Sequence, residues 1–266
     1  MRRATRTNLV LAALAVLLGL LAWRQVRDEV AMREPPLAAI DADAVTRIRV
    51  QCAGCIERRF LRTPQGWRMT APYDLDADPL AIARLLAIAA APVRLREPAA
   101  AYDAAKIGLD PPVMELELDD VRIDIGDTDA LRGDRYVRDG EHIARVADRF
   151  SPFLMATPES ELERRTVPRG AAIVHLRIDG AEVAAAKIAA WQAMPVAKIT
   201  AIDAADIRTA QHVVEVELAD GTRIAWQLGH AADGWIARRT SPPLDYHLDA
   251  RAVERFLAAD ADRDGD

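Results

Sequence analysis

A pair of cysteines, in the segment Cys-Ala-Gly-Cys at residues 52–55, has the clearest potential for chemistry in this sequence. Catalytic redox pairs with this spacing place the first thiol at the amino terminus of a helix, where the helix dipole lowers the thiol pKa. Here the following residues, Ile56 to Leu61, alternate as a strand does. A β-turn brings its first and fourth residues within about 7 Å, a separation that a disulfide can span. The pattern favours a local structural disulfide between Cys52 and Cys55, with free or metal-binding thiols and redox catalysis as alternatives.

The other residue types that often carry chemistry form no recognisable motif. Metal binding at the cysteines would need two more ligands, and no second Cys/His pair has suitable spacing. The five histidines are scattered along the chain, at His142, His175, His212, His230 and His247. The sequence contains no glycine-rich phosphate loop, no His-Glu-x-x-His and no Gly-x-Ser-x-Gly. We therefore predict no catalytic residue, no cofactor and no metal ion.

Two acidic segments have simpler explanations than a functional site. Residues 260–265 match the opening of a calcium-binding EF-hand loop, but the printed sequence ends before the glutamate that such a loop needs at position twelve. We interpret residues 258–266 as an acidic tail. Asp78 stands directly before Pro79, an order typical of a helix N-cap, and this role explains it better than half of a glycosidase pair.

The amino terminus holds an uncharged apolar run, residues 9–23, behind a basic head that contains three arginines in residues 1–8. Burying charge in hydrocarbon is costly, so such a run either lies in lipid or is removed as a signal peptide. Leu20 is too large for the cleavage signal, and no Ala-x-Ala stands at the end of the run. We expect a transmembrane signal anchor at residues 9–23, with a cleaved signal peptide or a buried core helix as alternatives.

Charge predicts the location and excludes one class of partner. The positive-inside rule places the basic head, residues 1–8, in the cytoplasm. We therefore expect a single-pass protein of the inner (cell) membrane that contacts the lipid bilayer through residues 9–23 and has its bulk in the periplasm. The formal net charge of -6 argues against a nucleic-acid partner, which requires clustered Lys and Arg. Arg58, Arg59 and Arg62 are interpreted as parts of solvated faces.

The elements that position these residues follow from hydrophobic periodicity. Charged and Pro-rich residues 24–43 predict a linker. Period-two alternation predicts a hairpin with an odd-length loop, which places Ile48, Val50, Ile56 and Phe60 on one face. Further strands, and helices capped by Asp78 and Asp249, complete a first lobe at residues 44–165 and a second lobe at residues 166–257. The segment from Glu182 to Ala193 fits either a helix or a strand.

The two lobes echo each other in sequence. A shift of 168 residues aligns Gly66-Trp67 with Gly234-Trp235 and Ile48 with Val216 without a gap. Both segments then continue through prolines into an Asp-capped helix. We predict an α+β fold with one N-terminal transmembrane helix and a two-lobed body of antiparallel hairpins with flanking helices, built on an internal repeat. Trp67 and Trp235 are then core residues rather than platforms for sugars.

The motifs that carry a family resemblance are Val45-Thr46-Arg47-Ile48, Gly66-Trp67-Arg68-Met69 with Pro72, Ala77-Asp78, Gly108-Leu109-Asp110-Pro111-Pro112, Ile125-Gly126 and Tyr136-Val137. In this order the chain resembles, over roughly residues 40 to 260, the bacterial envelope family of domain of unknown function 4340. The resemblance implies a membrane-tethered, non-cytoplasmic protein, and some members accompany ABC transporter components. It implies no catalytic residues.

These observations lead to one main functional hypothesis and two alternatives. The main hypothesis is a non-enzymatic, membrane-anchored periplasmic accessory, binding or scaffold protein that associates with an ABC-transporter-type envelope complex. The first alternative is a periplasmic thiol-disulfide oxidoreductase that uses Cys52 and Cys55. The second is an envelope polysaccharide binder or hydrolase, which would need a cleft with exposed tryptophans and paired carboxylates.

Overall fold

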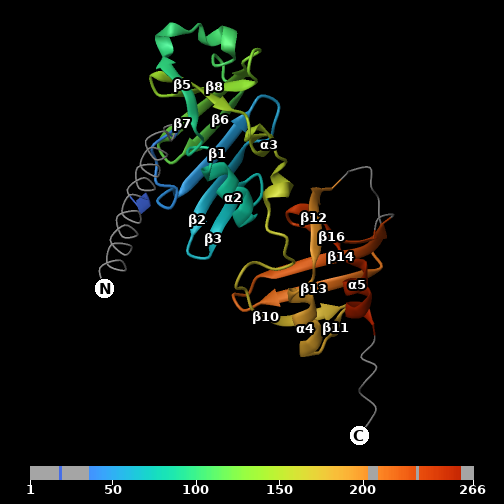
Figure 1. The fold of residues 1–266 in the computed structure, drawn as a ribbon. Coiled ribbons are helices and arrows are strands. Elements are labelled where there is room, and N and C mark those ends of the chain that lie inside the picture. Colours follow the sequence, from blue (N-terminus) through green and yellow to red (C-terminus); the bar gives the residue numbers. More distant parts are fainter. Residues whose placement is uncertain (1–17, 20–35, 203–208, 232–233, 259–266) are drawn as a thin grey trace, which may run out of the picture.

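The structure is a computed structural model that describes residues 18–19, 36–202, 209–231 and 234–258. The described residues form two antiparallel sheets with a few short helices, a mostly β variant of the expected α+β fold (Figure 1). The predicted basic head, nearly all of the predicted anchor at 9–23, and the acidic tail beyond residue 258 lie outside the described residues. Within the described part of the chain, no helix has the length and apolar character needed to cross a membrane.

The first sheet contains nine strands of the described chain. In spatial order they are β4 (Leu75–Asp76), β3 (Gly66–Ala71), β2 (Arg58–Thr63), β1 (Arg47–Cys52), β6 (Met114–Leu118), β7 (Val121–Thr128), β8 (Asp134–Asp139), β9 (His142–Ala147) and β5 (Val93–Pro98). Hairpins join most neighbours, whereas β1 pairs with β6 and β5 pairs with β9 across longer stretches of chain. The short 3-10 helices η1 (Ala99–Ala101) and η2 (Ala104–Ile107) follow β5. Gly108 ends η2 with a positive φ of 68°, a conformation that glycine adopts readily.

Helix α2 (Pro79–Leu86) covers one face of this sheet together with α3 (Ser151–Leu154). The N-cap prediction is confirmed, because the Asp78 side chain accepts a hydrogen bond from the Leu80 N–H at 2.9 Å. Ile82 and Leu85 of α2 are buried in the same core as the inward-facing strand residues. The alternation of the strands thus places apolar side chains under the helices and polar side chains on the opposite face.

The first hairpin has the predicted odd-length loop, with one correction. Ile48 lies opposite Phe60 and Val50 lies opposite Arg58. The prediction for Ile56 is wrong: this side chain is 56% exposed and lies before β2 begins. The chain leaves the ladder at the cysteine turn, so the inward position next to Phe60 is occupied by Arg58.

Arg58 is also the clearest exception to the predicted solvated arginines. Arg59 and Arg62 are exposed as expected, but Arg58 has an exposure of 0%. Its Nη1 lies 2.6 Å from Oε1 of Glu161, in the 3-10 helix η3 (Pro158–Glu161). The guanidinium also donates to the carbonyl oxygens of Phe153 and Leu154 at the end of α3. The sequence pattern could not reveal this burial, because the covering residues are about 100 positions away.

The Arg58–Glu161 contact is a compromise between attraction and desolvation. Burial raises the pKa of Glu161 to about 7, and the neighbouring Arg58 only partly opposes this rise. Nε of Arg58 and Oε2 of Glu161 are buried without a hydrogen-bond partner among the described residues. The contact therefore fixes where η3 lies more than it adds stability.

The second sheet contains seven strands of the described chain. In spatial order they are β11 (Ala181–Glu182), β10 (Ile173–Ile178), β13 (His212–Leu218), β14 (Arg223–Ala231), β15 (Gly234–Thr240), β16 (Pro243–Leu248) and β12 (Val196–Ala201). The ambiguous segment after residue 181 forms the short strand β11 and then helix α4 (Ala185–Gln192). Strands β4, β5, β12 and β16 have no counterpart in the sequence prediction.

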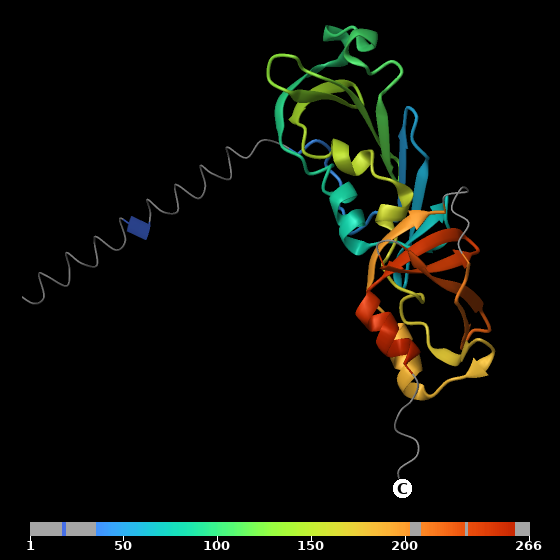
Figure 2. The ribbon, with the colours of Figure 1, turned by 90° about the vertical axis from the view of Figure 1, so that its right-hand side faces the viewer.

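Aromatic side chains fill the core of the second lobe. Helix α5 (Ala250–Leu257) begins at Asp249, whose side chain accepts from the Ala252 N–H at 2.9 Å, so this N-cap prediction is also confirmed. Figure 2 shows α4 and α5 side by side against the second sheet. Between helices and sheet, the Trp226 ring lies 4.7 Å from Tyr246 and Trp191 lies 5.1 Å from Phe256, measured between ring centroids.

The two lobes share part of their strand register. Gly66 lies opposite Thr63 and Gly234 lies opposite Ala231, positions 168 residues apart, and both glycines have φ 129°. The ungapped alignment is wrong for the first strand, however. Phe60 pairs with Ile48, while its counterpart Leu228 pairs with His212 rather than Val216. The registers differ by four residues because the first ladder closes at Val50 opposite Arg58 and the second at Glu217 opposite Arg223, around turns of different length and place.

The described end of the predicted linker, residues 36–43, packs on the first lobe. Leu37 and Ala38 are buried. Their N–H groups donate to the carbonyl oxygens of Ala91 and Ala89, each at 2.9 Å. The first lobe therefore includes residues that the sequence pattern assigns to a linker. Two apolar side chains in a Pro-rich segment are too weak a signal to predict this packing.

The Glu161→Gln variant should remove a pH dependence from the stability of the protein. In the unfolded chain Glu161 ionises near its ordinary pKa of 4.5, whereas burial keeps it protonated in the folded protein up to about pH 7. Between these values the folded state binds more protons, so the wild type loses stability as the pH rises. We expect a loss of about 3 kcal/mol across this window, and no such loss from this site in Glu161→Gln.

Urea unfolding of both proteins at a series of pH values measures this difference. Glu254→Gln, on the exposed side of α5, is the control and should keep the wild-type slope. A Glu161→Gln profile parallel to the wild-type profile would contradict the raised pKa.

Candidate functional site

The two cysteines form a disulfide within a turn. Cys52 ends β1, and its Cα lies 5.4 Å from that of Cys55. The Cys55 N–H donates to the Cys52 carbonyl at 3.3 Å, and Gly54 has the positive φ of 80° that suits this turn. The next element is strand β2, so no helix dipole acts on either sulfur. The geometry agrees with the structural disulfide and lacks the feature that lowers a catalytic thiol pKa.

The histidines form no common site, although His212 and His230 both pack against the Trp235 ring, at 6.4 and 5.1 Å between centroids. Nδ1 of His175 is 2.9 Å from a Glu182 oxygen, and Nδ1 of His212 is 2.8 Å from an Asp179 oxygen. His142 begins β9, His230 lies near the end of β14, and His247 contacts Thr200. Among the residues that the structure describes, no three His, Cys, Asp or Glu side chains are placed to hold a metal ion.

The tryptophans do not form a sugar platform. Trp235 is only 8% exposed. Trp67 is partly buried, and the Arg62 guanidinium lies over its ring at 5.4 Å from the centroid. The polysaccharide alternative needs exposed aromatic faces, which these two positions do not provide.

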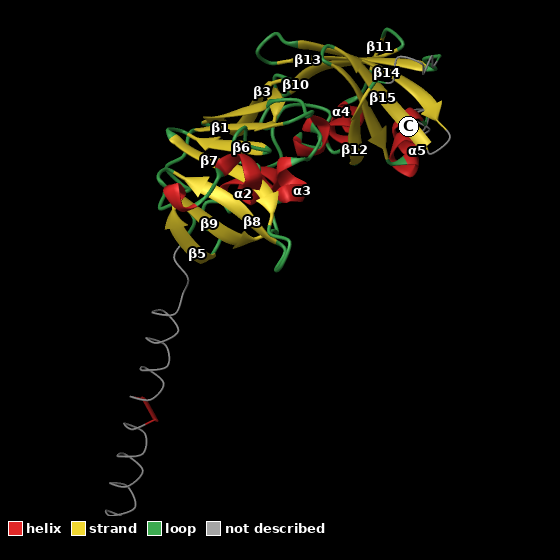
Figure 3. Ribbon diagram, turned by 90° about the horizontal axis from the view of Figure 1, so that it is seen from above, coloured by secondary structure: helices red, strands yellow, loops and turns green. Residues whose placement is uncertain are grey.

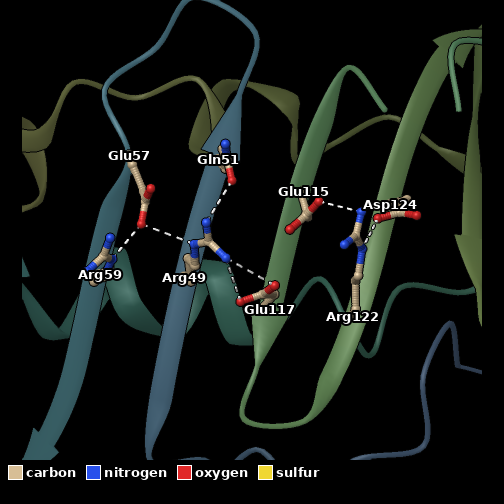
Figure 4. A network of polar contacts seen from close by, with 8 residues as sticks. All are labelled: Arg49, Gln51, Glu57, Arg59, Glu115, Glu117, Arg122 and Asp124. Atoms are coloured by element: carbon tan, nitrogen blue, oxygen red, sulfur yellow. Dashed lines mark hydrogen bonds and ion pairs between the residues drawn. The ribbon is translucent and has the colours of Figure 1, made fainter. Parts of the chain in front are cut away.

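A network of charged side chains lies across four strands of the first sheet (Figure 4). We call this surface the charged face; it comprises Arg49, Gln51, Glu57, Arg59, Glu115, Glu117, Arg122 and Asp124. Arg49 of β1 is its centre, with Nε 3.1 Å from Glu57 and Nη1 3.4 Å from Glu117. Arg122 of β7 contacts Glu115 at 2.6 Å and Asp124 at 2.7 Å. Positive and negative groups therefore alternate along this chain of contacts, in which Glu57 bridges the directly opposed Arg49 and Arg59.

The environment of each carboxylate sets its ionisation. A hydrogen bond from Arg59, with help from Arg49, holds the pKa of Glu57 below its ordinary value. Burial raises the pKa of Glu115, and its hydrogen bond with Glu117 adds to the rise while Arg122 opposes it. The surroundings thus favour the charged form of Glu57 and disfavour that of Glu115.

Asp124 anchors the charged face to the body of the lobe. Its side chain is 6% exposed, and it accepts from Nε of Arg138 at 3.0 Å as well as from Arg122. Arg138 Nη2 also donates to the Leu109 carbonyl at 3.1 Å. Two guanidinium groups thus compensate one buried carboxylate.

The charged face is open because the helices lie on the other side of the sheet. In Figure 3, α2 and α3 lie on the same side of the strands β1, β6 and β7. Arg49, Arg59 and Arg122 keep more than a third of their side chains exposed. This face of the sheet is therefore available to a partner.

A second feature is a cleft of about 500 Å³ between the two lobes. It is lined by residues of β3 and β4, by the connecting segment from Leu162 to Ala172, and by the second lobe around Asp220, Arg239 and Tyr246. The sequence gives no sign of it, because its walls come from segments up to about 180 residues apart.

Sequence reasoning did not single out the charged face, although a local signal exists. The triplets Arg47-Ile48-Arg49, Glu115-Leu116-Glu117 and Arg122-Ile123-Asp124 each alternate charge with a buried apolar residue. This pattern predicts a charged sheet face. The pairing of β1 with β6, which brings Arg49 opposite Glu117, is a long-range contact that the triplets do not specify.

The Cys52→Ser, Cys55→Ser double variant should fold and lose at most about 2 kcal/mol of unfolding free energy, because the bridge closes a very short loop. Urea unfolding of the variant, and of the wild type with and without dithiothreitol, measures the loss. A wild-type insulin-reduction activity that the variant lacks would contradict a purely structural disulfide.

Arg138→Met should destabilise the protein by about 3 kcal/mol or more, because it removes a partner of a buried carboxylate. Arg49→Met, in a partly exposed part of the same face, should cost at most about 1 kcal/mol. Chemical denaturation of the two variants compares the costs directly. Equal costs would mean that burial of Asp124 does not govern the network.

Comparison with known families gives one match, to the model of the domain of unknown function DUF4340, over residues 67–259. The match spans both sheets from β3 to α5 and begins after the β1–β2 hairpin, which the expected resemblance included. No curated protein and no solved structure matches the chain significantly. Because the family model covers well over half of the sequence, the chain belongs to the DUF4340 family.

Proposed function

We propose that this chain is a non-enzymatic accessory protein of the cell envelope. In this proposal residues 9–23 anchor it in the inner membrane, and the folded body binds a protein partner on the periplasmic side. The observation that carries the proposal is the open charged face, a wide sheet surface that no described helix covers. The apolar run near the amino terminus supports the membrane location.

The chemistry of the charged face favours a protein partner over a polyanion. Arg49 and Arg122 each contact two carboxylates, so the face has no excess of positive charge for nucleic acid or anionic lipid. Alternating charges match a surface that alternates in the opposite order, which gives specificity to an encounter. A periplasmic domain of a transporter complex is the partner that we propose.

Apolar side chains next to the charged face would add affinity. Leu61 projects from β2 on the same side as Arg59, and its side chain is exposed. Ile56, in the loop after the disulfide, is exposed as well. Protein interfaces combine such apolar contacts with a polar surround, and the disulfide would hold Ile56 in place.

We also infer that the two lobes derive from an internal repeat. The common register of Gly66 and Gly234 supports this origin, and so do the Asp-capped helices α2 and α5 that follow. At the positions aligned with Arg47 and Arg49, β13 of the second lobe has Glu215 and Glu217, so the alternation is repeated with the opposite charge, and we assign the proposed docking role to the first lobe.

Affinity capture of the full-length protein from detergent-solubilised membranes tests the proposed function. The wild type should recover a specific membrane complex, and the Arg59→Glu, Arg122→Glu variant should recover at least about tenfold less, because reversed charges meet like charges across the interface.

The matched control is Arg177→Glu, Arg223→Glu, which reverses two charges on the open face of the second sheet. It should recover the wild-type amount. Equal recovery by all three proteins, or no specific partner for any of them, would refute the role of the charged face.

A further inference from the structure

The cleft between the lobes contains an arginine with an unusual environment. Arg239 is half-buried on the core-facing side of β15, directly opposite Trp226 of β14. Its guanidinium lies 5.9 Å from the centroid of the Trp226 ring, and its Nε donates to the Ser241 carbonyl at 2.7 Å. No carboxylate of the described residues lies within ion-pair distance of Arg239, so neutral groups hold this charge in place.

Tyr246 forms the wall beside Arg239. Its side chain is buried, and burial raises the pKa of its phenol while the nearby Arg239 opposes the rise. An aromatic ring behind a guanidinium and a phenol beside it restrict the guanidinium to one orientation. Such a preorganised planar fork suits a carboxylate or a phosphate group.

The acidic residues of the cleft, in contrast, are already engaged. Arg68 contacts Asp74 at 2.5 Å and Asp76 at 3.3 Å. Arg165 and Arg169 both contact Glu163, each at 3.0 Å. The other oxygen of Glu163, Oε2, is buried and has no partner among the described residues, but water or a ligand cannot reach it without a rearrangement.

Asp220, at the second-lobe side of the cleft, accepts from the Thr222 N–H at 2.9 Å within its turn. Like Arg239, Asp220 has no ion-pair partner among the described residues, but Asp220 is exposed whereas Arg239 is half-buried. The half-buried lining charge that lacks an ion-pair partner among the described residues is therefore positive, and it favours an anionic group over a cationic one.

The remaining lining of the cleft is largely apolar. Leu75 and Leu162 contribute from the first lobe, Val167 and Pro168 from the connecting segment, and Ile224 from the second lobe. A volume of about 500 Å³ lies in the range of small-ligand sites. The ligand that fits thus joins a small apolar group to an anionic head.

We propose that the interlobe cleft binds a small anionic amphiphile, with its carboxylate or phosphate head on Arg239 and its apolar part against the lining between the lobes. This site is separate from the charged face and does not depend on the proposed partner. Binding at Arg239 would also connect the lobes, because the opposite wall of the cleft belongs to the first lobe and the connecting segment.

Protection from phenylglyoxal, a reagent specific for arginine, tests this proposal on the unmodified full-length chain in nanodiscs. Butyrate and butyl phosphate are the probes, and neutral butyramide is the control. Mass spectrometry of peptides should show that at least one of the two anions slows modification of Arg239 several-fold and that butyramide does not. Arg223, which lies on the other face of the same sheet, is the internal control and should react at the same rate throughout.

The two anionic probes identify the head group: protection by butyrate alone indicates a carboxylate, and protection by butyl phosphate alone indicates a phosphate. Unchanged modification of Arg239 with both anions, or equal protection by butyramide, would overturn the proposal.

A binding titration gives an independent measurement. Tryptophan fluorescence should respond to the protecting anion because Trp226 lies beneath Arg239. Arg239→Gln should weaken binding by at least about tenfold through loss of a charge-assisted contact, and Arg239→Lys should recover part of it. Arg223→Gln should bind as the wild type does. Wild-type affinity in Arg239→Gln would refute the assignment, and the protection experiment still decides the question if that variant does not fold.

Discussion

The buried contact between Arg58 and Glu161 holds the segment that joins the two sheets. A guanidinium shielded from water needs acceptors around it, because an unpaired buried charge costs several kcal/mol. Arg58 finds them in the Glu161 carboxylate and in the last carbonyl groups of α3, which requires α3 and η3 to lie over β2. The same placement brings Leu162 into a bridge with Ala77 and positions the chain to leave the first lobe beside the cleft.

The two lobes solve the same packing problem with different chemistry. Arg58 of β2 and Trp226 of β14 are 168 positions apart and so occupy equivalent positions in the two lobes. Both side chains are fully buried. In the second lobe α4 and α5 present apolar surface, so an aromatic side chain fills the position. In the first lobe the end of α3 presents carbonyl groups, so a cation fits there. What covers a sheet face therefore decides whether its inward residue is apolar or charged.

Exposure likewise separates the charged side chains that stabilise the lobe from those that a partner could contact. Asp124 is buried, is compensated by two arginines and serves the lobe itself. Arg49 and Arg59 on the same face form partly exposed ion pairs, which contribute little to stability. These groups can change partners at low cost, which is the property that a docking surface needs. Arg239 in the cleft combines both conditions, since it is half-buried and yet lacks a carboxylate partner among the described residues.

The sequence by itself determined the features that depend on near neighbours. The N-caps at Asp78 and Asp249, the turn at the cysteines and most hairpins follow from residues a few positions apart, and the family follows from the order of such motifs. Only the tertiary structure decided the burial of Arg58, the places of β5, β12 and β16, the assembly of the charged face and the walls of the cleft. Alternation along a strand fixes which side chains share a face, but it does not fix which strand lies beside it or what covers it. The neighbouring strand and the covering elements depend on contacts between distant segments. The free energy of burying a charged side chain depends on these contacts most.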